Sequence, residues 1–249
     1  MGKLPKEIFL YGEGVPEEYI DALHSYLNDK LGYATILRKG YIVYDERAPF
    51  VLASLRIRGP HGERREPLPL EIEVEKRGLE RRSPPKGVLY DGWEFMRYIR
   101  SLLPSHSISQ LHILVTTRLL STEEGGIHHI RAILLGYPCI ISTSGLVEGP
   151  AKPRKFYLFR RLGNEELYQA VEEDNTLRHD DPRLPLVLRG YTLQALFYHA
   201  TGNPFCKDKG CCLYNAHWQD ELIYAQLESP YELCPLHKNL MEELKKGNG

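Results

Sequence analysis

The chain has 249 residues, of which 42% are hydrophobic and 26% are charged, and its formal net charge is −1. A chain of this length forms one large domain or two small ones, and it buries roughly 70–75% of its unfolded surface without needing disulfides. The near-neutral charge gives no general argument for nucleic-acid binding, and no run of about 18 apolar residues predicts a membrane span. The N-terminus lacks the apolar segment of a secretory signal. We therefore expect a cytoplasmic protein with no membrane contact and no nucleotide cofactor.

The chain begins with the patterns of strands and helices in alternation. Residues 8–11 predict a short strand, and Pro16 with two following glutamates predicts the start of a helix. This helix has an apolar stripe at helical spacing and ends at Gly32. The stripe consists of Ile20, Leu23, Leu27 and Leu31. Two short strands are predicted next, at residues 35–37 and 41–43.

Residues 56–86 differ from their surroundings, because Arg, Glu, Pro and Gly dominate there. We interpret this segment as an exposed insertion, with residues 70–74 as its one candidate edge strand. Its mixture of both signs of charge favours a solvated hairpin or loop over a nucleic-acid patch. Asp91 then caps a second helix, which Pro104 ends. The apolar stripe of that helix consists of Phe95, Tyr98, Ile99, Leu102 and Leu103.

The second half of the chain, residues 105–249, continues the alternation. Strands are predicted at residues 111–116, 127–135 and 139–142, and Cys139 within the last of them is predicted to be a core residue. The remaining predicted elements are, in chain order, a basic loop-plus-strand at 150–161, a helix at 165–173, a helix that Thr192 caps and that contains His199, and a closing helix at 236–245. With no internal repeat and no clean linker, the pattern predicts a single mixed α/β domain over residues 1–249.

Four of the five cysteines lie in the last quarter of the chain, and a histidine follows the last of them at the third residue. The segment runs Cys206, Cys211, Cys212 and then, after a long spacer, Cys234 and His237. Paired soft or borderline ligands at short spacing, twice over, are the usual sequence form of a closed tetrahedral zinc site. We predict one structural zinc held by Cys206, Cys234, His237 and either Cys211 or Cys212. Four protein ligands leave no open position for chemistry.

The helical stretch before these cysteines lies where a zinc peptidase of the metzincin type has its catalytic motif, H-E-x-x-H-x-x-G-x-x-H. Histidines four residues apart lie on one face of a helix, and the glycine lets the chain turn back and supply the third ligand. The glutamate takes the proton from zinc-bound water. This chain contains only part of that pattern.

The segment from 192 to 240 resembles the archaemetzincin family, in which the motif runs directly into a further set of cysteines. His199-x-x-Gly202 and Cys206-x4-Cys211 match the family pattern without gaps. This register favours Cys211 over Cys212 as the ligand. The resemblance implies a metzincin-like fold, and it implies that the later cysteines form the family's structural zinc site.

The same register shows which catalytic groups are missing. Ala195 stands at the first histidine position, Leu196 at the glutamate position and Phe205 at the third histidine position. Leu213 replaces the methionine that lies under the zinc in the family, and His237 replaces the last cysteine of the family's C-x-x-C pair. The resemblance therefore implies a divergent member with a degenerate catalytic motif and a retained structural zinc.

A weaker similarity to the family extends upstream, through residues 112–120 and 136–146 and the helix that Asp91 begins. One histidine cannot hold a catalytic zinc by itself, so a rebuilt metal centre would need other ligands around His199. The candidates are His128, His129, His217 and Asp220, none of which has a spacing that recommends it. We interpret His199 as a hydrogen-bonded remnant of the motif.

Three functional hypotheses follow. The first is a non-catalytic, zinc-stabilised pseudoenzyme that binds a peptide or a macromolecule. The second is a metallopeptidase with a rearranged catalytic metal site. The third is an RNA- or ribosome-associated zinc protein, for which the basic segment 150–161 and the insertion 56–86 would supply the contact surface. The sequence names neither the partner nor the oligomeric state.

Overall fold

The computed structural model describes residues 2–32, 36–58, 66–104, 107–163 and 165–247. The chain divides into two compact units. The N-terminal unit is Pro5–Gly145, and the C-terminal unit is Leu146–Gly249 together with the first residues up to Leu4. A single domain over residues 1–249 stays a prediction. Thr35 of the predicted strand at 35–37 lies outside the described residues.

The N-terminal unit is built on a five-stranded mixed sheet with the strand order β2-β1-β4-β8-β7. The strands are β1 (Glu7–Glu13), β2 (Ile36–Gly40), β4 (Gln110–Thr116), β7 (Ile133–Leu134) and β8 (Cys139–Ser142). The first four in this order are parallel, and β7 alone is antiparallel to its neighbour. From Leu111 to Val115, strand β4 is buried on both faces and apolar except for His112, as expected for a central parallel strand. The predicted mixed α/β class is confirmed.

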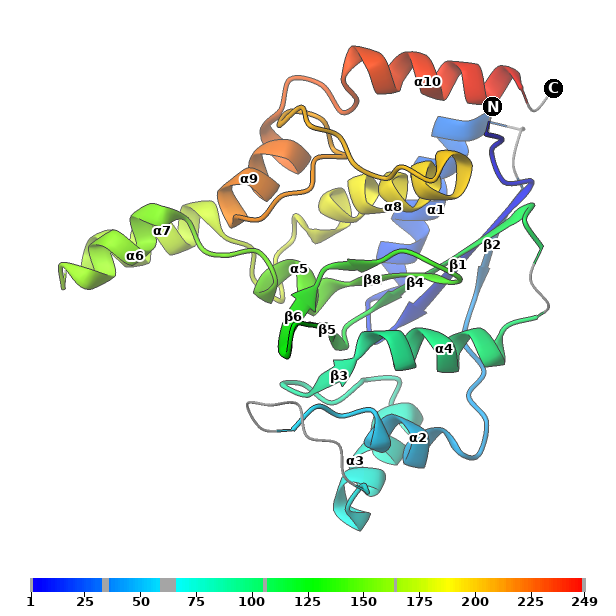
Figure 1. The fold of residues 1–249 in the computed structure, drawn as a ribbon, viewed down its shortest axis with the longest axis vertical. Coiled ribbons are helices and arrows are strands. Elements are labelled where there is room, and N and C mark those ends of the chain that lie inside the picture. The colour runs from blue at the N-terminus through cyan, green and yellow to red at the C-terminus, as the bar shows by residue number, and fades with distance from the viewer. Residues whose placement is uncertain (1, 33–35, 59–65, 105–106, 164, 248–249) are drawn as a thin grey trace. The chain divides into compact units, whose positions relative to one another are not determined.

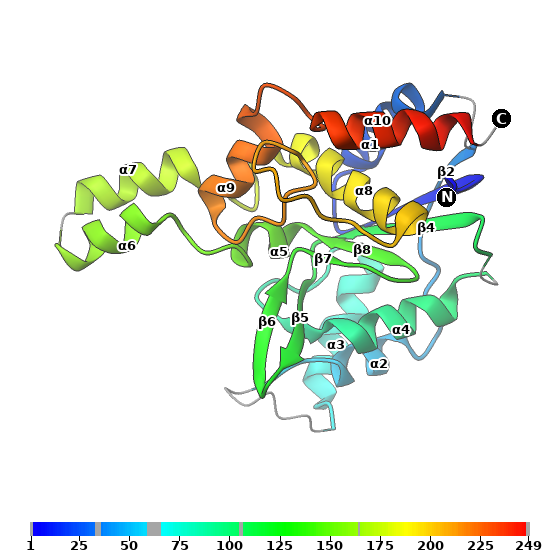
Figure 2. The same cartoon turned by 45° about the horizontal axis from the view of Figure 1, so that its top comes forward.

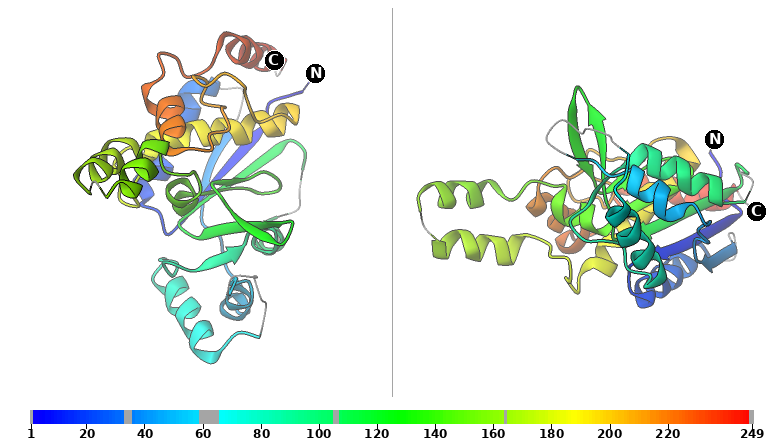
Figure 3. Two further views of the ribbon diagram at one scale, coloured as in Figure 1. Left: turned by 60° about the vertical axis from the view of Figure 1, so that its left-hand side comes forward. Right: turned by 90° about the horizontal axis from the view of Figure 1, so that it is seen from below.

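Helices α1 (Glu17–Leu31) and α4 (Gly92–Leu102) cover opposite faces of this sheet (Figures 1 and 3). The predicted stripe of α1 is buried along its whole length. The N-cap of α4 is Asp91, whose Oδ1 accepts a hydrogen bond of 2.9 Å from the backbone N–H of Glu94. Both helices were therefore predicted correctly from capping residues and apolar spacing. Residues 41–43 form no strand and connect β2 to the next helix as extended chain.

A second, three-stranded sheet in the same unit has the order β3-β5-β6. Its strands are β3 (Leu89–Asp91), β5 (Leu119–Glu124) and β6 (Ile127–Arg131). Strands β5 and β6 form a hairpin (Figure 2) whose turn is Gly125-Gly126, and both glycines have positive φ, 63° and 80°. The prediction of one strand over 127–135 was wrong, because the chain passes from β6 in this sheet to β7 in the other.

The predicted exposed loop at 56–86 contains a helix instead. Helix α3 (Pro69–Glu80) packs beside α2 (Ala48–Ser54), as Figure 3 shows, and residues 70–74 lie within α3 rather than in a strand. Proline at the first helical position and a Glu71 carboxylate that accepts from the backbone N–H of Leu68 at 2.7 Å begin the helix. The apolar pattern missed α3 because Leu70 is 73% exposed, whereas the fully buried residue of this helix is the charged Glu75.

A buried ionic network joins α3 to the sheet. The Arg118 guanidinium is fully buried and donates to Glu13 Oε1 at 2.9 Å and to Glu75 Oε2 at 3.0 Å. Glu75 Oε1 also accepts from Arg56 and from the Tyr90 hydroxyl at 2.7 Å. Burial alone would lower the pKa of Arg118, but the adjacent Glu13 carboxylate and its other anionic neighbours hold that pKa well above its usual value. Two guanidinium groups and two carboxylates make the network neutral.

Arg118→Met should destabilise the protein by about 3–5 kcal/mol, because it leaves two carboxylates buried without their shared partner. The free energy of unfolding measured by urea denaturation would test this. The matched control is Arg97→Met, which removes an exposed ion pair with Glu94 and should cost less than about 1 kcal/mol. Equal costs for the two variants would show that the network does not stabilise the fold.

The C-terminal unit is mainly helical. Its helices are α6 (Arg154–Arg161), α7 (Glu165–Asn175), α8 (Leu184–Thr201), α9 (Gln219–Ile223), the π-helix η2 (Tyr224–Glu228) and α10 (Pro235–Lys246), while α5 (Thr143–Glu148) lies across the boundary between the units. Helices α6 and α7 form a hairpin (Figures 1 and 2). No helix among the described residues is both long and apolar enough to span a membrane.

Two predictions in this unit were wrong. The basic segment 150–161 is not a loop and strand, since α6 occupies most of it. Thr192 does not cap α8, which begins eight residues earlier at Leu184 with a proline in its first turn, and Thr192 is fully buried within it. Gly190 lies inside this helix. The Gln226 side chain packs close to its backbone, since a Cβ at Gly190 would lie 1.8 Å from Gln226 Oε1.

Candidate metal centre

Four side chains of the C-terminal unit converge on one point. The ligand atoms of Cys206, Cys211, Cys234 and His237 all lie within 4.8 Å of one another. Individual separations are 3.8 Å for Cys206 Sγ to Cys234 Sγ, 3.9 Å for Cys211 Sγ to His237 Nδ1, and 3.2 Å for Cys234 Sγ to His237 Nδ1. Zinc–sulfur bonds of about 2.3 Å in a tetrahedron require ligand atoms about 3.8 Å apart. The donor set and its spacing therefore fit zinc.

The first pair of ligands lies in a tight loop that follows α8. Gly202 ends that helix in the left-handed conformation with φ of 75°, and its N–H donates to Tyr198 O at 2.8 Å. The N–H of Cys206 then donates to Leu213 O at 2.9 Å, which closes the loop. Within the loop the N–H of Asp208 donates to the Cys206 sulfur at 3.3 Å. This hydrogen bond fixes the orientation of the sulfur, as hydrogen bonds to metal ligands commonly do.

The second pair of ligands lies at the start of α10. Cys234 is the N-cap residue, Pro235 occupies the first helical turn, and His237 follows within the same turn. The His237 ring lies 5.4 Å from the Phe197 ring of α8 in a perpendicular arrangement. The C-P-L-H sequence therefore places a thiol and an imidazole side by side, because a helix start brings the N-cap and the third residue after it onto one side.

The cluster includes Cys211 and not Cys212. The backbone carbonyl of Cys212 accepts hydrogen bonds from Gln226 Nε2 at 2.8 Å and from Gln194 Nε2 at 3.2 Å. These two glutamines hold the loop in place, and sequence reasoning missed them because they are distant in the chain and carry no motif. The structure brings Cys211 into the cluster, and its choice over Cys212 as a metal ligand stays a prediction.

The electrostatics of the thiols differ within the cluster. A hydrogen bond from Cys212 lowers the pKa of Cys211 to about 5, and backbone N–H groups and His237 act in the same direction. Burial raises the pKa of Cys206 to about 12. In a zinc complex all three cysteines are thiolates, so bound zinc would supply positive charge that offsets the cost of burying the Cys206 thiolate.

The catalytic positions of the degenerate motif lie in the last turns of α8. Ala195 and Leu196 are 0% and 1% exposed, and His199 is half-buried. Among the described residues, the Cys206–Cys211–Cys234–His237 cluster is the one group of three or more His, Cys, Asp or Glu side chains with metal-site spacing. His199 does not belong to such a group. The same holds for the candidate replacement ligands His128, His129, His217 and Asp220.

The remaining cysteine, Cys139, is fully buried in β8 of the N-terminal unit, as predicted for a core residue. Its thiol donates to Gly136 O at 3.4 Å, and burial raises its pKa to about 11. It has no part in the metal centre.

Comparison with known proteins assigns the family. The probable metallopeptidase family DUF6775 matches residues 4–244, so the chain belongs to that family. Archaemetzincin from Methanopyrus kandleri is similar in structure over 97% of this chain and 96% of its own, with a TM-score of 0.51 and 13% identity. A zinc-dependent peptidase from Methanocorpusculum labreanum is similar over 94% of this chain and 99% of its own, with a TM-score of 0.48 and 14% identity. No curated protein sequence matches the chain. The likeness to archaemetzincin confirms the predicted fold.

Cys234→Ser should remove bound zinc and destabilise the C-terminal unit strongly, because zinc binding by such sites contributes on the order of 10 kcal/mol. Cys211→Ser should do the same, whereas Cys212→Ser should keep its zinc. Elemental analysis and thermal melting of the three purified variants would test this. If Cys212→Ser alone lost its zinc, Cys212 and not Cys211 would be the metal ligand. Unchanged melting in all three variants and in excess chelator would show that the site holds no metal.

Proposed function

We propose that this member of the probable metallopeptidase family is a zinc-stabilised protein without peptidase activity, which acts by binding a peptide or a macromolecule in the cytoplasm. One observation carries the proposal. Ala195 and Leu196, which stand where the metzincin motif has its first histidine and its glutamate, are buried aliphatic side chains within α8.

Peptide hydrolysis by the family mechanism needs three protein ligands, an open zinc position and a general base. His199 is the one motif histidine that remains, and Phe205 stands at the third ligand position. The proposal also draws support from the metal cluster of the C-terminal unit. Its four protein ligands form a closed set, and a closed set leaves no position for water or substrate. One zinc per chain, with a structural role, is therefore part of the proposal.

Leu196→Glu tests whether the old catalytic position has become part of the core. The substitution should lower the free energy of unfolding by about 3 kcal/mol or more, because it buries a carboxylate among apolar side chains. Leu186→Glu is the matched control on the same helix, where the leucine is 44% exposed and the cost should be about 0.5 kcal/mol or less.

Urea denaturation measures both costs, and a fluorogenic peptide assay with added zinc measures activity. Peptide hydrolysis by the parent protein would contradict the proposal. A Leu196→Glu variant that is as stable as the parent would show that this position is not part of the core, and hydrolysis by that variant would indicate that a catalytic cleft survives around His199.

A second candidate function is RNA or ribosome binding, and helix α6 favours it. Four cationic side chains, Arg154, Lys155, Arg160 and Arg161, lie on this eight-residue helix. Tyr157 and Leu158 between them are 48% and 53% exposed. A helix that offers cations and an exposed aromatic ring together has the chemistry that single-stranded RNA contacts need.

Replacing Arg160 and Arg161 together by glutamine should weaken RNA binding and reduce the steepness of its salt dependence by about two charges, if the second candidate is right. Fluorescence anisotropy with a labelled single-stranded RNA over a salt series measures both quantities. Arg81 and Arg97, which are exposed in the N-terminal unit, provide the control pair. No binding by the parent protein at low salt would exclude this function.

A further inference from the structure

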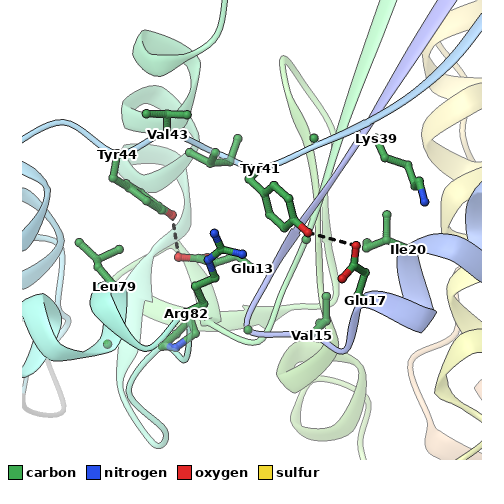
Figure 4. Close-up of a pocket in the computed structure, with 16 residues that line it drawn as sticks. Glu13, Val15, Glu17, Ile20, Lys39, Tyr41, Val43, Tyr44, Leu79 and Arg82 are labelled. Atoms are coloured by element: carbon green, nitrogen blue, oxygen red, sulfur yellow. Dashed lines mark hydrogen bonds between the residues drawn. The ribbon is translucent and has the colours of Figure 1, made fainter.

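A cavity of about 620 Å³ lies in the N-terminal unit (Figure 4). All its lining residues come from the part of the chain between Gly12 and Pro84, whereas the metal cluster belongs to the C-terminal unit. Its floor is the end of β1 and the loop that follows it, from Gly12 to Val15, and one wall is the end of β2 with residues 41–44. The first turns of α1 and the C-terminal end of α3 complete it. This volume is in the range of cavities that hold small ligands.

The position of the cavity follows from the sheet topology. Strands β1 and β2 are parallel, so their carboxyl ends, at Glu13 and Gly40, lie at the same edge of the sheet. The chain leaves β1 through α1 to reach β2 on one side, whereas β4 pairs with β1 on the other side. Ligands of open α/β sheets bind at the carboxyl edge where the strand order reverses in this way.

The walls of the cavity are packed against one another. Gly14 has a φ of 72°, and a Cβ there would lie 2.4 Å from Pro84 Cδ, so the loop after β1 and the segment after α3 are in direct contact. Glu13 is fully engaged, since it accepts from the Tyr44 hydroxyl at 2.6 Å, from Thr116 and from Arg118. The cavity is therefore preformed, and Glu13 leaves its floor neutral.

Arg82 enters the cavity from a strained backbone position. Helix α3 ends with the N–H of Ser83 donating to Gly78 O at 2.9 Å and the N–H of Arg82 donating to Leu79 O at 3.1 Å, which is the Schellman pattern. That pattern places Arg82 at a φ of 51°, where glycine is usual. It is the one residue other than glycine with positive φ in the described part of the chain. Such strain clusters at functional positions.

The Arg82 guanidinium is available for a ligand. Its Cζ lies 4.7 Å from the centre of the Tyr41 ring, and among the described residues no carboxylate forms an ion pair with it. Tyr41 itself is 54% exposed, and its hydroxyl donates to Glu17 Oε1 at 3.1 Å. Figure 4 shows Arg82 and Glu17 on opposite sides of the Tyr41 ring. The cavity thus presents a cation over the face of the Tyr41 ring and an anion at its hydroxyl.

The anionic end is net negative in spite of a nearby lysine. Lys39 lines the cavity near Glu17, but its ammonium is already paired with Asp21. Glu17 also lies in the first turn of α1, where its carboxylate offsets the positive end of the helix dipole and makes this end unsuited to an anionic ligand. Apolar side chains such as Ile20, Val43 and Leu79 line the space between the two ends.

We propose that this cavity binds a short zwitterionic peptide with apolar side chains, whose terminal carboxylate pairs with Arg82 and whose terminal ammonium pairs with Glu17. Because Arg82 stacks on the Tyr41 ring while Glu17 lies at the hydroxyl of that ring, the two charges are separated by part of the ring. The termini of a dipeptide match this separation better than the adjacent charges of a free amino acid. The inference does not depend on the proposed function, since no residue of the cavity belongs to the zinc cluster or to α8.

Isothermal titration of the full, zinc-loaded chain with leucyl-leucine tests the proposal. The dipeptide should bind saturably. Acetyl-leucyl-leucine, which lacks the ammonium, and leucyl-leucine amide, which lacks the carboxylate, should each bind at least about tenfold more weakly. Free leucine should also bind more weakly than the dipeptide. Equal binding of dipeptide and acetylated dipeptide would overturn the proposal in favour of a simple anion site, and no saturable binding up to about 10 mM would remove the site altogether.

Two variants of cavity residues test which residue binds which terminus of the dipeptide. Arg82→Gly should bind the dipeptide at least about tenfold more weakly and no longer distinguish it from its amide, and Glu17→Gln should no longer distinguish it from its acetyl form. Arg82→Gly cannot fail by unfolding, because glycine relieves the strain at positive φ and should leave the melting temperature equal or higher. The matched controls are Arg81→Gln and Glu18→Gln, which do not line the cavity and should bind as the parent does. If the cavity variants behave like these controls, the assignment of both ends is wrong.

Discussion

The C-terminal unit depends on the convergence of three thiols and one imidazole. Helix α10 buries only His237, Met241 and Leu244 among its twelve residues, a stripe too narrow to hold it firmly by apolar contact alone. The cluster adds a polar crosslink, because Cys206 and Cys211 come from the loop after α8 while Cys234 and His237 begin α10. Buried thiols without a metal would gain little from this arrangement. Bound zinc would turn the same four side chains into a crosslink between the loop after α8 and the start of α10.

The proposed function distinguishes two metal roles in the same stretch of chain, a structural role that is kept and a catalytic role that is lost. A structural site needs only four ligands held at tetrahedral spacing, and the loop and the helix start provide them. A catalytic site needs ligands on one helix face together with a base and open space. In α8 the positions that the family register assigns to the first histidine and the glutamate carry Ala195 and Leu196, which are buried and contribute to packing. Family membership and fold are retained, since both depend on the packing of the elements and not on the catalytic groups.

Sequence reasoning succeeded where the deciding interactions are local. Asp91 as an N-cap and the apolar stripe of α1 both depend on neighbouring residues within one or two helical turns. It failed for α3, because that helix is held by Glu75 and two arginines, Arg56 and Arg118, that lie far from it in the chain. It also missed the Arg82 cavity, since neither a helix end with arginine in the place of glycine nor the nearby Tyr41 is a recognisable motif. Long-range ionic contacts leave no period in a sequence, whereas apolar packing does.

The central claim is that the metal chemistry of this chain is confined to one closed site. Elemental analysis of protein purified without added metal, before and after mild chelation, tests it most directly. The account predicts one zinc per chain that mild chelation does not remove and that leaves only when the protein unfolds. Two metals per chain, one of them removable by mild chelation, would contradict the account and indicate a second centre around His199. A chain that folds with no metal at all would contradict it as well.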